Sequence, residues 1–251
     1  MTSLDSYLNL CTQVYDLSKP TPPSDAYAFY RSYVLSAKGN ILEPMCGTGR
    51  YLLPFVAEGF NVHGCDASKH MLDALYMKAK IKNLKINVWH EWVEDLKTQE
   101  KYQLIFIPSG SFGLITDLQK AKNTLKTFYN LLSDKGRLVF EVETLKAISM
   151  QVGVWRGAMY SREDGKFILA NFLDLPLKNH IGSSICRYEL VEGNAILETE
   201  IEIIKVRLYE PKNLCDTLTE VGFTEIKMVK AFNHNKSPDP DDEVIVYQCR
   251  K

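Results

Sequence analysis

Short apolar runs alternate with helical segments through the first two thirds of the chain. The apolar runs cover residues 41–42, 61–65, 86–89, 104–107 and 138–142, and the helical segments between them cover 49–58, 68–80 and 117–132. Such an alternation over ~100 residues is typical of a parallel sheet with helices on both faces.

After residue 150 the pattern changes to closely spaced β-rich segments. These segments are 154–160, 166–173, 184–191 and 195–208, and turn-forming residues at 164–165, 179–182 and 192–194 separate them. This spacing predicts antiparallel hairpins. A helix over 211–221 that ends at Gly222, followed by strands over 223–229 and 244–249, then predicts a return to the first pattern. We therefore expect the hairpins to be an insertion within one domain.

The first ~35 residues predict two helices separated by the break Pro20-Thr21-Pro22-Pro23. Leu4, Tyr7, Leu8 and Cys11 fall on one face of the first of them.

The composition is that of a globular protein without a strong charge. The 251 residues include 30 Lys and Arg against 31 Asp and Glu, a formal net charge of −1. This balance disfavours general nucleic-acid binding through phosphate neutralisation. The six cysteines occur singly, which favours neither a zinc site nor a disulfide framework. Without a signal-peptide pattern or a run long enough to cross a bilayer, we expect a cytoplasmic protein with no metal and no membrane contact.

The stretch from Ile41 to Tyr51 carries the first candidate chemistry. A strand ends at Glu43, a loop containing Gly47 and Gly49 follows, and a helix is expected from Gly49. Glycines allow the backbone to approach a ligand closely. Asp66 ends the next strand, 17 residues after Gly49, where an acidic side chain can accept two hydrogen bonds from a ribose diol. The alternative for Asp66 is a helix cap.

The residues around the loop distinguish between nucleoside cofactors. A dinucleotide fingerprint requires a third glycine where this chain has Leu52, and Glu43 would repel a pyrophosphate. No Gly-Lys-Ser/Thr sequence follows, which excludes a P-loop. An adenosyl ligand with a cationic centre and an amino group would instead be attracted by Glu43. The sequence thus predicts S-adenosylmethionine as the cofactor and S-adenosylhomocysteine as the product.

Two motifs resemble those of class I S-adenosylmethionine-dependent methyltransferases. Residues 43–49 resemble the glycine motif of that family, and residues 66–72 resemble its second motif. The resemblance implies that Glu43 contacts the methionine amino group, that the glycines hold the methionyl part, and that Asp66 binds the ribose. It also implies that Ala67 and Met71 flank the adenine. Met45 stands where many members have their first glycine.

The resemblance is weaker at the third motif and continues after the fourth strand. Glu91-Trp92-Val93 matches a position where the family usually has Gly-Asp-apolar, and Trp92 either packs against the adenine edge or belongs to the core. Pro108-Ser109 is expected to contact the cofactor through its backbone. Tyr15 is either the cofactor-side tyrosine of the family or a packing residue. The predicted cofactor-binding residues are Tyr15, Glu43, Met45, Cys46, Gly47, Gly49, Asp66, Ala67, Met71, Trp92, Val93, Pro108 and Ser109.

The layout after the fifth strand resembles that of small-molecule N-methyltransferases of the amino-sugar type. The residues that this suggests for the substrate are Phe112, Glu143, Trp155 and Tyr188, with ordinary packing or solvent-facing roles as the alternative for each. Ser109 and Ser111 favour turn formation over proton transfer. The sequence contains no nucleophile beside an evident base, so a covalent mechanism is not indicated and the catalytic residue is unknown.

The sequence as a whole predicts a doubly wound α/β fold, Rossmann-like, with a seven-stranded, mostly parallel sheet. We expect a single domain over 1–251, with an N-terminal helical cover (1–38), a cofactor-binding core (39–150), an antiparallel β substrate cover (151–209) and a last helix with two strands (210–251). The predicted activity is methyl transfer by in-line displacement to a small molecule, an amine, by a monomer or homodimer. The alternatives are a methyltransferase for protein or RNA, and an S-adenosylmethionine-binding module without turnover.

Overall fold

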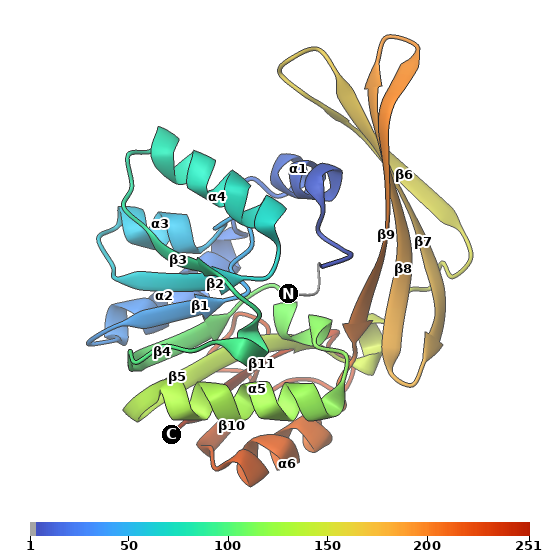
Figure 1. Ribbon diagram of the computed structural model, residues 1–251. Coiled ribbons are helices and arrows are strands. Elements are labelled where there is room, and N and C mark those ends of the chain that lie inside the picture. Colours follow the sequence, from blue (N-terminus) through green and yellow to red (C-terminus); the bar gives the residue numbers. More distant parts are fainter. Residues whose placement is uncertain (1–3) are drawn as a thin grey trace.

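The computed structural model describes residues 4–251 and is built around a seven-stranded sheet of order β10-β11-β5-β4-β1-β2-β3 (Figure 1). The strands are β1 (Ile41–Pro44), β2 (Val62–Asp66), β3 (Asn87–His90), β4 (Tyr102–Ile107), β5 (Leu132–Glu143), β10 (Thr224–Lys230) and β11 (Val244–Arg250). Only β11 is antiparallel to its neighbours among these strands. The predicted Rossmann-like, mostly parallel sheet is confirmed.

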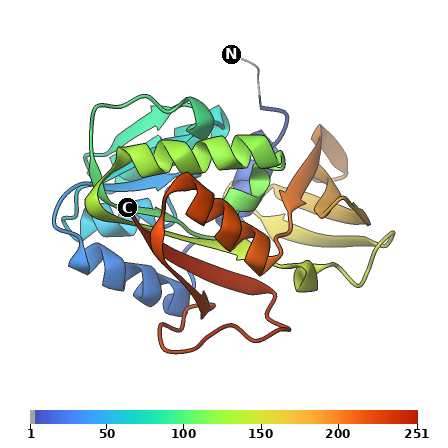
Figure 2. The same cartoon turned by 90° about the horizontal axis from the view of Figure 1, so that it is seen from below.

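Helices cover both faces of this sheet, as Figure 2 shows from below. The helices α2 (Ser24–Ser36), α3 (Leu52–Ala57) and α4 (Lys69–Ile81) pack on one face, and α5 (Leu118–Leu131) and α6 (Pro211–Val221) pack on the other. Each face has its own cluster of buried side chains. Side chains of β4 alternate between them: Leu104 and Phe106 lie in the cluster under α2, α3 and α4, and Ile105 and Ile107 lie in the cluster under α5 and α6. Burial on both faces explains the unbroken apolar run of this strand.

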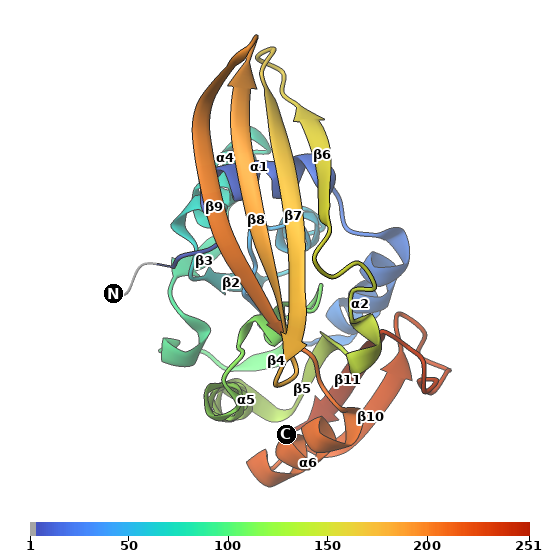
Figure 3. The same ribbon diagram turned by 90° about the vertical axis from the view of Figure 1, so that its right-hand side faces the viewer.

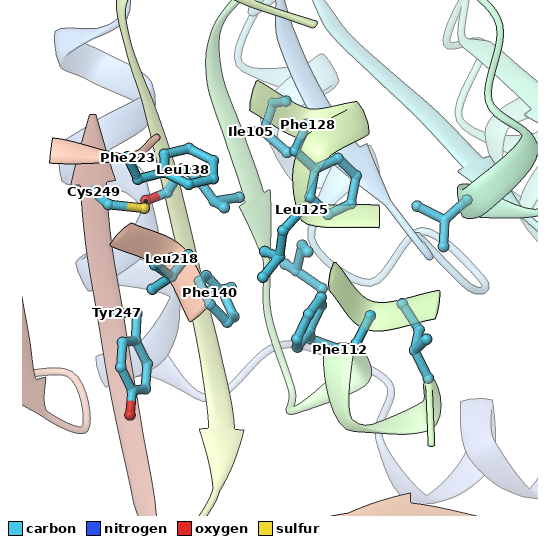
Figure 4. Packing of buried hydrophobic residues seen from close by; sticks show 14 of the residues in the cluster. Ile105, Phe112, Leu125, Phe128, Leu138, Phe140, Leu218, Phe223, Tyr247 and Cys249 are labelled. Carbon is cyan, nitrogen blue, oxygen red and sulfur yellow. Dashed lines mark hydrogen bonds between the residues drawn. The ribbon is translucent and has the colours of Figure 1, made fainter. Parts of the chain in front are cut away.

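Figure 4 shows the cluster on the face that α5 and α6 cover. Phe128 of α5 and Leu218 of α6 pack there with Phe140 of β5. The Phe140 ring stacks on Tyr247 with 5.4 Å between ring centroids.

Helix boundaries agree with the sequence expectation except at the glycine loop and at the N-terminus. There the first helix, α1 (Asn9–Ser18), begins only at Asn9, so the expectation that Leu4, Tyr7 and Leu8 lie on a helix face is wrong. The predicted helix over 211–221 is α6, and it ends at Gly222 with the left-handed φ of 112°. The helix expected over 49–58 is shorter, because α3 begins only at Leu52. Gly49 has a φ of 77°, which an α-helix cannot accommodate, so residues 47–51 remain a turn.

A second, four-stranded antiparallel sheet lies between β5 and α6 in the chain. It consists of β6 (Trp155–Ser161), β7 (Phe167–Lys178), β8 (Ile181–Glu192) and β9 (Ala195–Arg207), paired in chain order. This confirms the predicted hairpin insertion. The short 3₁₀ helices η1 (Val93–Asp95), η2 (Ser111–Leu114) and η3 (Leu145–Ala147) complete the described elements of the chain.

The two N-terminal helices have different positions. Helix α1 (Asn9–Ser18) packs with Leu10 and Val14 against the inner face of the second sheet and lies beside α4. Helix α2 instead packs on the main sheet, where Tyr27 stacks on Phe55 at 4.8 Å between centroids. Of these two helices, only α1 therefore covers the carboxyl ends of the parallel strands. The expectation that both helices do so is wrong for α2, because its apolar face is used for sheet packing.

Two glutamates of β9 hold the N-terminal end of α1. Glu202 accepts hydrogen bonds from the backbone N–H groups of Tyr7 and Leu8 at 2.9 and 2.7 Å, and Glu200 accepts from Leu10 and Cys11 at 3.0 and 2.9 Å. The helix has no capping side chain of its own and no acidic residue in its first turn. The β9 carboxylates therefore satisfy N–H groups that would otherwise be buried without partners.

We predict that Glu200→Ala destabilises the protein by about 1–3 kcal/mol, since two buried N–H groups lose their acceptor. Urea unfolding measures this loss, and hydrogen exchange at Leu10 and Cys11 should become faster. The matched control is Glu198→Ala, because Glu198 lies on the same strand and is exposed. Equal stability of the two variants would contradict the capping role.

A third buried carboxylate, Glu141, lies in β5 beneath the open edge of the main sheet. Its Oε1 accepts hydrogen bonds from the backbone N–H of Ser109 and from the Tyr30 hydroxyl, the latter at 3.2 Å. Burial raises the pKa of Glu141 to about 7, against the lowering effect of these hydrogen bonds. The side chain thus connects α2 with the loop that follows β4.

This shift predicts a pH-dependent contribution to stability. The unfolded chain releases the Glu141 proton near pH ~4.3, whereas the folded chain keeps it up to about pH 7, so stability falls as the pH rises through this interval. Glu141→Gln carries no titratable proton and retains an Oε1 acceptor. Urea unfolding at about pH 5 and about pH 7.5 should show a smaller decrease for Glu141→Gln than for the unchanged protein. Identical decreases would overturn the assignment.

Candidate active site

A cavity of about 860 Å³ opens at the carboxyl ends of the parallel strands. Glu43 of β1, Asp66 of β2 and Glu143 of β5 lie in its wall, each close to the end of its strand. The N-terminal segment 4–7 and strand β9 form the opposite wall. In open α/β sheets this edge is where ligands bind. All predicted cofactor-binding residues except Gly49 line the cavity.

The glycine loop enters the cavity with a left-handed backbone. Gly47 has a φ of 54° and Met45 a φ of 58°. A non-glycine residue in this conformation costs about 1–2 kcal/mol, which gives a physical reason for the glycine that the resemblance implies at position 45. Gly49 faces away from the cavity, since a Cβ there would lie 3.0 Å from Leu53 and Leu75. Its role in this structure is helix packing.

Glu43 is buried, and its Oε2 atom has no hydrogen-bond partner among the described residues. Burial raises the pKa of Glu43 well above its usual range, while Arg50 acts in the opposite direction. A buried carboxylate of this kind is stabilised by a cation in the cavity. The arrangement fits the ammonium group of an amino-acid moiety.

Asp66 is held in place by two backbone N–H groups. Gly47 donates to Oδ2 at 2.7 Å and Ser68 donates to Oδ1 at 2.8 Å. These bonds connect the glycine loop to the start of α4, so the two motifs form one structure. Each carboxylate oxygen can accept a further bond, as the two hydroxyls of a ribose require. Ser68, and not Asp66, provides the side-chain cap of α4, because its Oγ accepts from Met71 at 3.1 Å.

Trp92 and Val93 form the end of the cavity nearest to β3. Trp92 is half-buried in the cavity wall and is absent from the core clusters, so the core alternative is wrong and its contact with the adenine stays a prediction. Ala67 and Met71 lie in the same wall. Glu91 of the third motif and Glu94, which the sequence did not single out, also line this end of the cavity.

Tyr15 and Arg50 lie together beside the glycine loop. The Arg50 guanidinium is 5.3 Å from the centre of the Tyr15 ring, and it donates to the Ser109 hydroxyl. Asp16 of the same helix accepts from Thr48 Oγ1 at 2.5 Å and pairs with Lys78 Nζ at 2.8 Å. Helix α1 is thus bound to the glycine loop as well as to β9. Arg50 directly follows Gly49, and this adjacency to the loop is the signal that could have identified it.

At the β5 end, Glu143 is the predicted substrate residue that reaches the cavity. Burial raises its pKa, while Lys19, also in the wall, lowers it. Phe112 is buried in the core, 5.0 Å from Phe140 between ring centroids. Tyr188 is buried against α1 and donates to Cys11 Sγ at 3.4 Å. Trp155 lies on the opposite face of the second sheet and is 52% exposed.

The cavity is more acidic than the chain as a whole. Its wall contains seven acidic residues, Asp5, Glu43, Asp66, Glu91, Glu94, Glu143 and Glu202, and three basic residues, Lys19, Arg50 and Lys205. Such a wall attracts cationic ligands. Residues 4–251 contain no cluster of His, Cys, Asp or Glu that could hold a metal ion, and within the same range no helix is long and apolar enough to span a membrane.

Comparisons with known proteins agree with this geometry. Residues 41–136 match the family model described as a methyltransferase domain. A putative methyltransferase of Geobacillus sp. (strain WCH70) is 22% identical over 244 residues, which cover 94% of this chain and 96% of the relative.

Two solved structures share the fold. One is an S-adenosylmethionine-dependent methyltransferase from Clostridium acetobutylicum, with a TM-score of 0.80, 18% identity and coverage of 96% of this chain and 98% of the other. The second is CalS10, an amino pentose methyltransferase from Micromonospora echinaspora with S-adenosylmethionine bound, with a TM-score of 0.72, 14% identity and coverage of 100% of both chains. Residues 41–136 thus match a methyltransferase domain, and over nearly its whole length the chain is similar to S-adenosylmethionine-dependent methyltransferases, which supports S-adenosylmethionine as its cofactor.

Proposed function

We propose that this methyltransferase transfers the methyl group to a small-molecule amine. The observation that carries the proposal is the order of carboxylates along the sheet edge. Asp66 on β2 and Glu43 on β1 lie on the cofactor side, β4 comes next, and Glu143 on β5 lies beyond it. A ligand with its ribose at Asp66 and its amino group at Glu43 directs its reactive end toward β4 and the Glu143 side.

Each group of residues then has one task in the reaction. Bound S-adenosylmethionine supplies an electrophilic methyl group, and the protein has to align the acceptor with it and exclude water. Pro108 and Ser109 border the reacting position, and the bond from Ser109 N–H to Glu141 fixes their backbone. Tyr7, Glu202 and α1 close the cavity from above.

Glu143 is the proposed partner of the amine. An acceptor arrives as an ammonium ion in an acidic cavity and has to become neutral before it attacks. A carboxylate with a raised pKa can bind the ammonium and take up its proton. CalS10, which has the same fold, is described as an amino pentose methyltransferase, and this supports an amine on a small polar molecule.

The shape of the cavity favours a small acceptor over a protein or RNA. The N-terminal segment and β9 lie over the sheet edge, and only three basic residues line the wall. A phosphate backbone would meet seven acidic side chains there. We also propose a cytoplasmic location, since none of the six cysteines forms a disulfide.

We predict that Asp66→Ala weakens S-adenosylhomocysteine binding by about tenfold or more, because the ribose loses its acceptor and the glycine loop loses a bond. Calorimetric titration measures the dissociation constant. Asp73→Ala, an exposed carboxylate on α4, is the matched control and should bind normally. Absence of binding heat in the unchanged protein would refute the assignment of the cavity.

We further predict that Glu143→Gln raises the KM for an amine acceptor by about tenfold and leaves S-adenosylhomocysteine affinity within about twofold. The assay follows S-adenosylhomocysteine formation with a panel of alkylamines, amino sugars and their hydroxyl counterparts. Glu163→Gln, an exposed change in the β6–β7 turn, serves as the control. Turnover of hydroxyl acceptors alone would contradict the amine proposal, and binding without any turnover would favour a module that only binds the cofactor.

A further inference from the structure

A second, smaller cavity of about 170 Å³ adjoins the cavity of about 860 Å³ at the strand ends. The two share three wall residues, Glu143 of β5 and Ile204 and Val206 of β9. None of the predicted cofactor-binding residues lines the smaller cavity. A cofactor bound along the strand ends therefore leaves it free. We call it the side cavity, and we call the larger one the main cavity.

The side cavity lies between the inner face of the second sheet and the segment that follows β5. Figure 3 shows β7, β8 and β9 converging at their lower ends, close to that segment. The strand register places Asp174 of β7, Ser184 of β8 and Ile204 of β9 in one row, and all three residues line the side cavity. Helix α1 packs farther along the same face, near Ala170. The second sheet thus contributes to a ligand site beyond the part that α1 covers.

Backbone hydrogen bonds hold the opposite wall in place. The Gly153 N–H donates to the Asp174 carbonyl at 2.9 Å, and the Tyr209 N–H donates to the Glu143 carbonyl at 2.9 Å. The first bond ties the end of the segment to β7, and the second ties its start to the chain that follows β9. The side cavity is therefore formed without a ligand, as is usual for small-molecule sites.

The wall of the side cavity is mainly apolar and has no free charge apart from Glu143. Asp174 uses both of its carboxylate oxygens, because the Ser184 hydroxyl donates to Oδ1 at 2.6 Å and Arg156 donates to Oδ2. Among the described residues, no Lys, Arg or His lines this cavity. An anionic group would find no counter-charge there, whereas an apolar group gains free energy by leaving water.

The volume of the side cavity corresponds to a six-membered ring. An apolar cavity of ~150 Å³ in a protein core is large enough to bind benzene. Methyl transfer also sets the direction of the acceptor, since an amine points its lone pair at the methyl group and its substituents away from it. An amine nitrogen at Glu143 can therefore place its substituent in the side cavity while its lone pair is directed toward the main cavity.

We propose that the side cavity binds an uncharged, mainly apolar substituent of the acceptor, about as large as a six-membered ring, while Glu143 binds the amine. This inference rests on the proposed function and adds the class of amine. The acceptor carries a ring or a branched alkyl group next to its nitrogen and no anionic group on that side.

The test compares methylamine with cyclohexylmethylamine, which carries a six-membered ring in addition, at saturating S-adenosylmethionine. We expect kcat/KM to be at least about tenfold higher for the ring amine, since each buried methylene contributes roughly a factor of four. Val152→Phe places a larger side chain in the wall of the side cavity and should reduce this ratio by about tenfold. The matched control is Val154→Phe, two residues away and outside the wall, which should keep the ratio.

Both valines are partly exposed, Val152 at 39% and Val154 at 52%, so the substitutions do not overpack the core. Far-UV circular dichroism and S-adenosylhomocysteine binding verify that each variant is folded. A second measurement does not depend on turnover. Saturation-transfer NMR should detect cyclohexylmethanol bound to the protein loaded with S-adenosylhomocysteine, with a weaker signal in Val152→Phe. Binding of this alcohol without turnover of any amine would refute the proposed function and still support the ring site.

Three results would overturn the inference. The first is equal kcat/KM for the two amines, together with no binding of cyclohexylmethanol. The second is an equal loss of the ratio in Val152→Phe and Val154→Phe, which would assign the effect to the segment as a whole. The third is a preference for glucosamine 6-phosphate over both amines that Val152→Phe abolishes, because the side cavity would then hold an anion.

Discussion

The hydrogen bonds between the β9 glutamates and the start of α1 join the two sheets into one enzyme. Each carboxylate accepts two backbone N–H groups, so Glu200 and Glu202 fix both the end of the helix and the segment before it. That segment forms a wall of the cavity, with Tyr7 O accepting from the Ser68 hydroxyl at 2.6 Å. Without these bonds the N–H groups at the start of α1 would lose their acceptors, and the segment that covers the cavity would no longer be fixed to β9.

The cavity itself follows from the strand order. Parallel strands bring their carboxyl ends to one edge, and the order β3-β2-β1-β4-β5 arranges the chemistry along that edge. Trp92, Asp66, Glu43, Ser109 and Glu143 follow one another in the same sequence as the adenine, ribose, amino acid, methyl group and acceptor of the proposed complex. A single row of side chains along the strand ends, about as long as the cofactor, is therefore enough in the proposed complex to bind the cofactor and to orient its reactive end.

The sequence was sufficient for those parts of the site that depend on local motifs. Residues 43–49 and 66–72 each lie on one strand–loop–helix unit, so their spacing fixes their geometry, and the structure brings them together through Asp66 and Gly47. Phe112, Trp155 and Tyr188 lie outside the cavity because their position depends on which face of a strand or turn meets the core. The alternation of apolar and polar residues along a strand shows that the strand has two different faces. It does not show which face another element covers. Glu202 could not be found, since its partner Tyr7 is 195 residues away.

The distribution of buried charge connects cofactor binding to the stability of the fold. Glu43 has an unpartnered oxygen, and burial raises the pKa values of Glu43, Asp66 and Glu143. Each of these groups destabilises the protein when it is ionised without a counter-charge. A cationic ligand favours the ionised form of these carboxyl groups and binds only the folded chain. Its binding therefore raises the free energy of unfolding. The acidic wall is thus unfavourable for the empty enzyme and selects ligands that carry a positive centre.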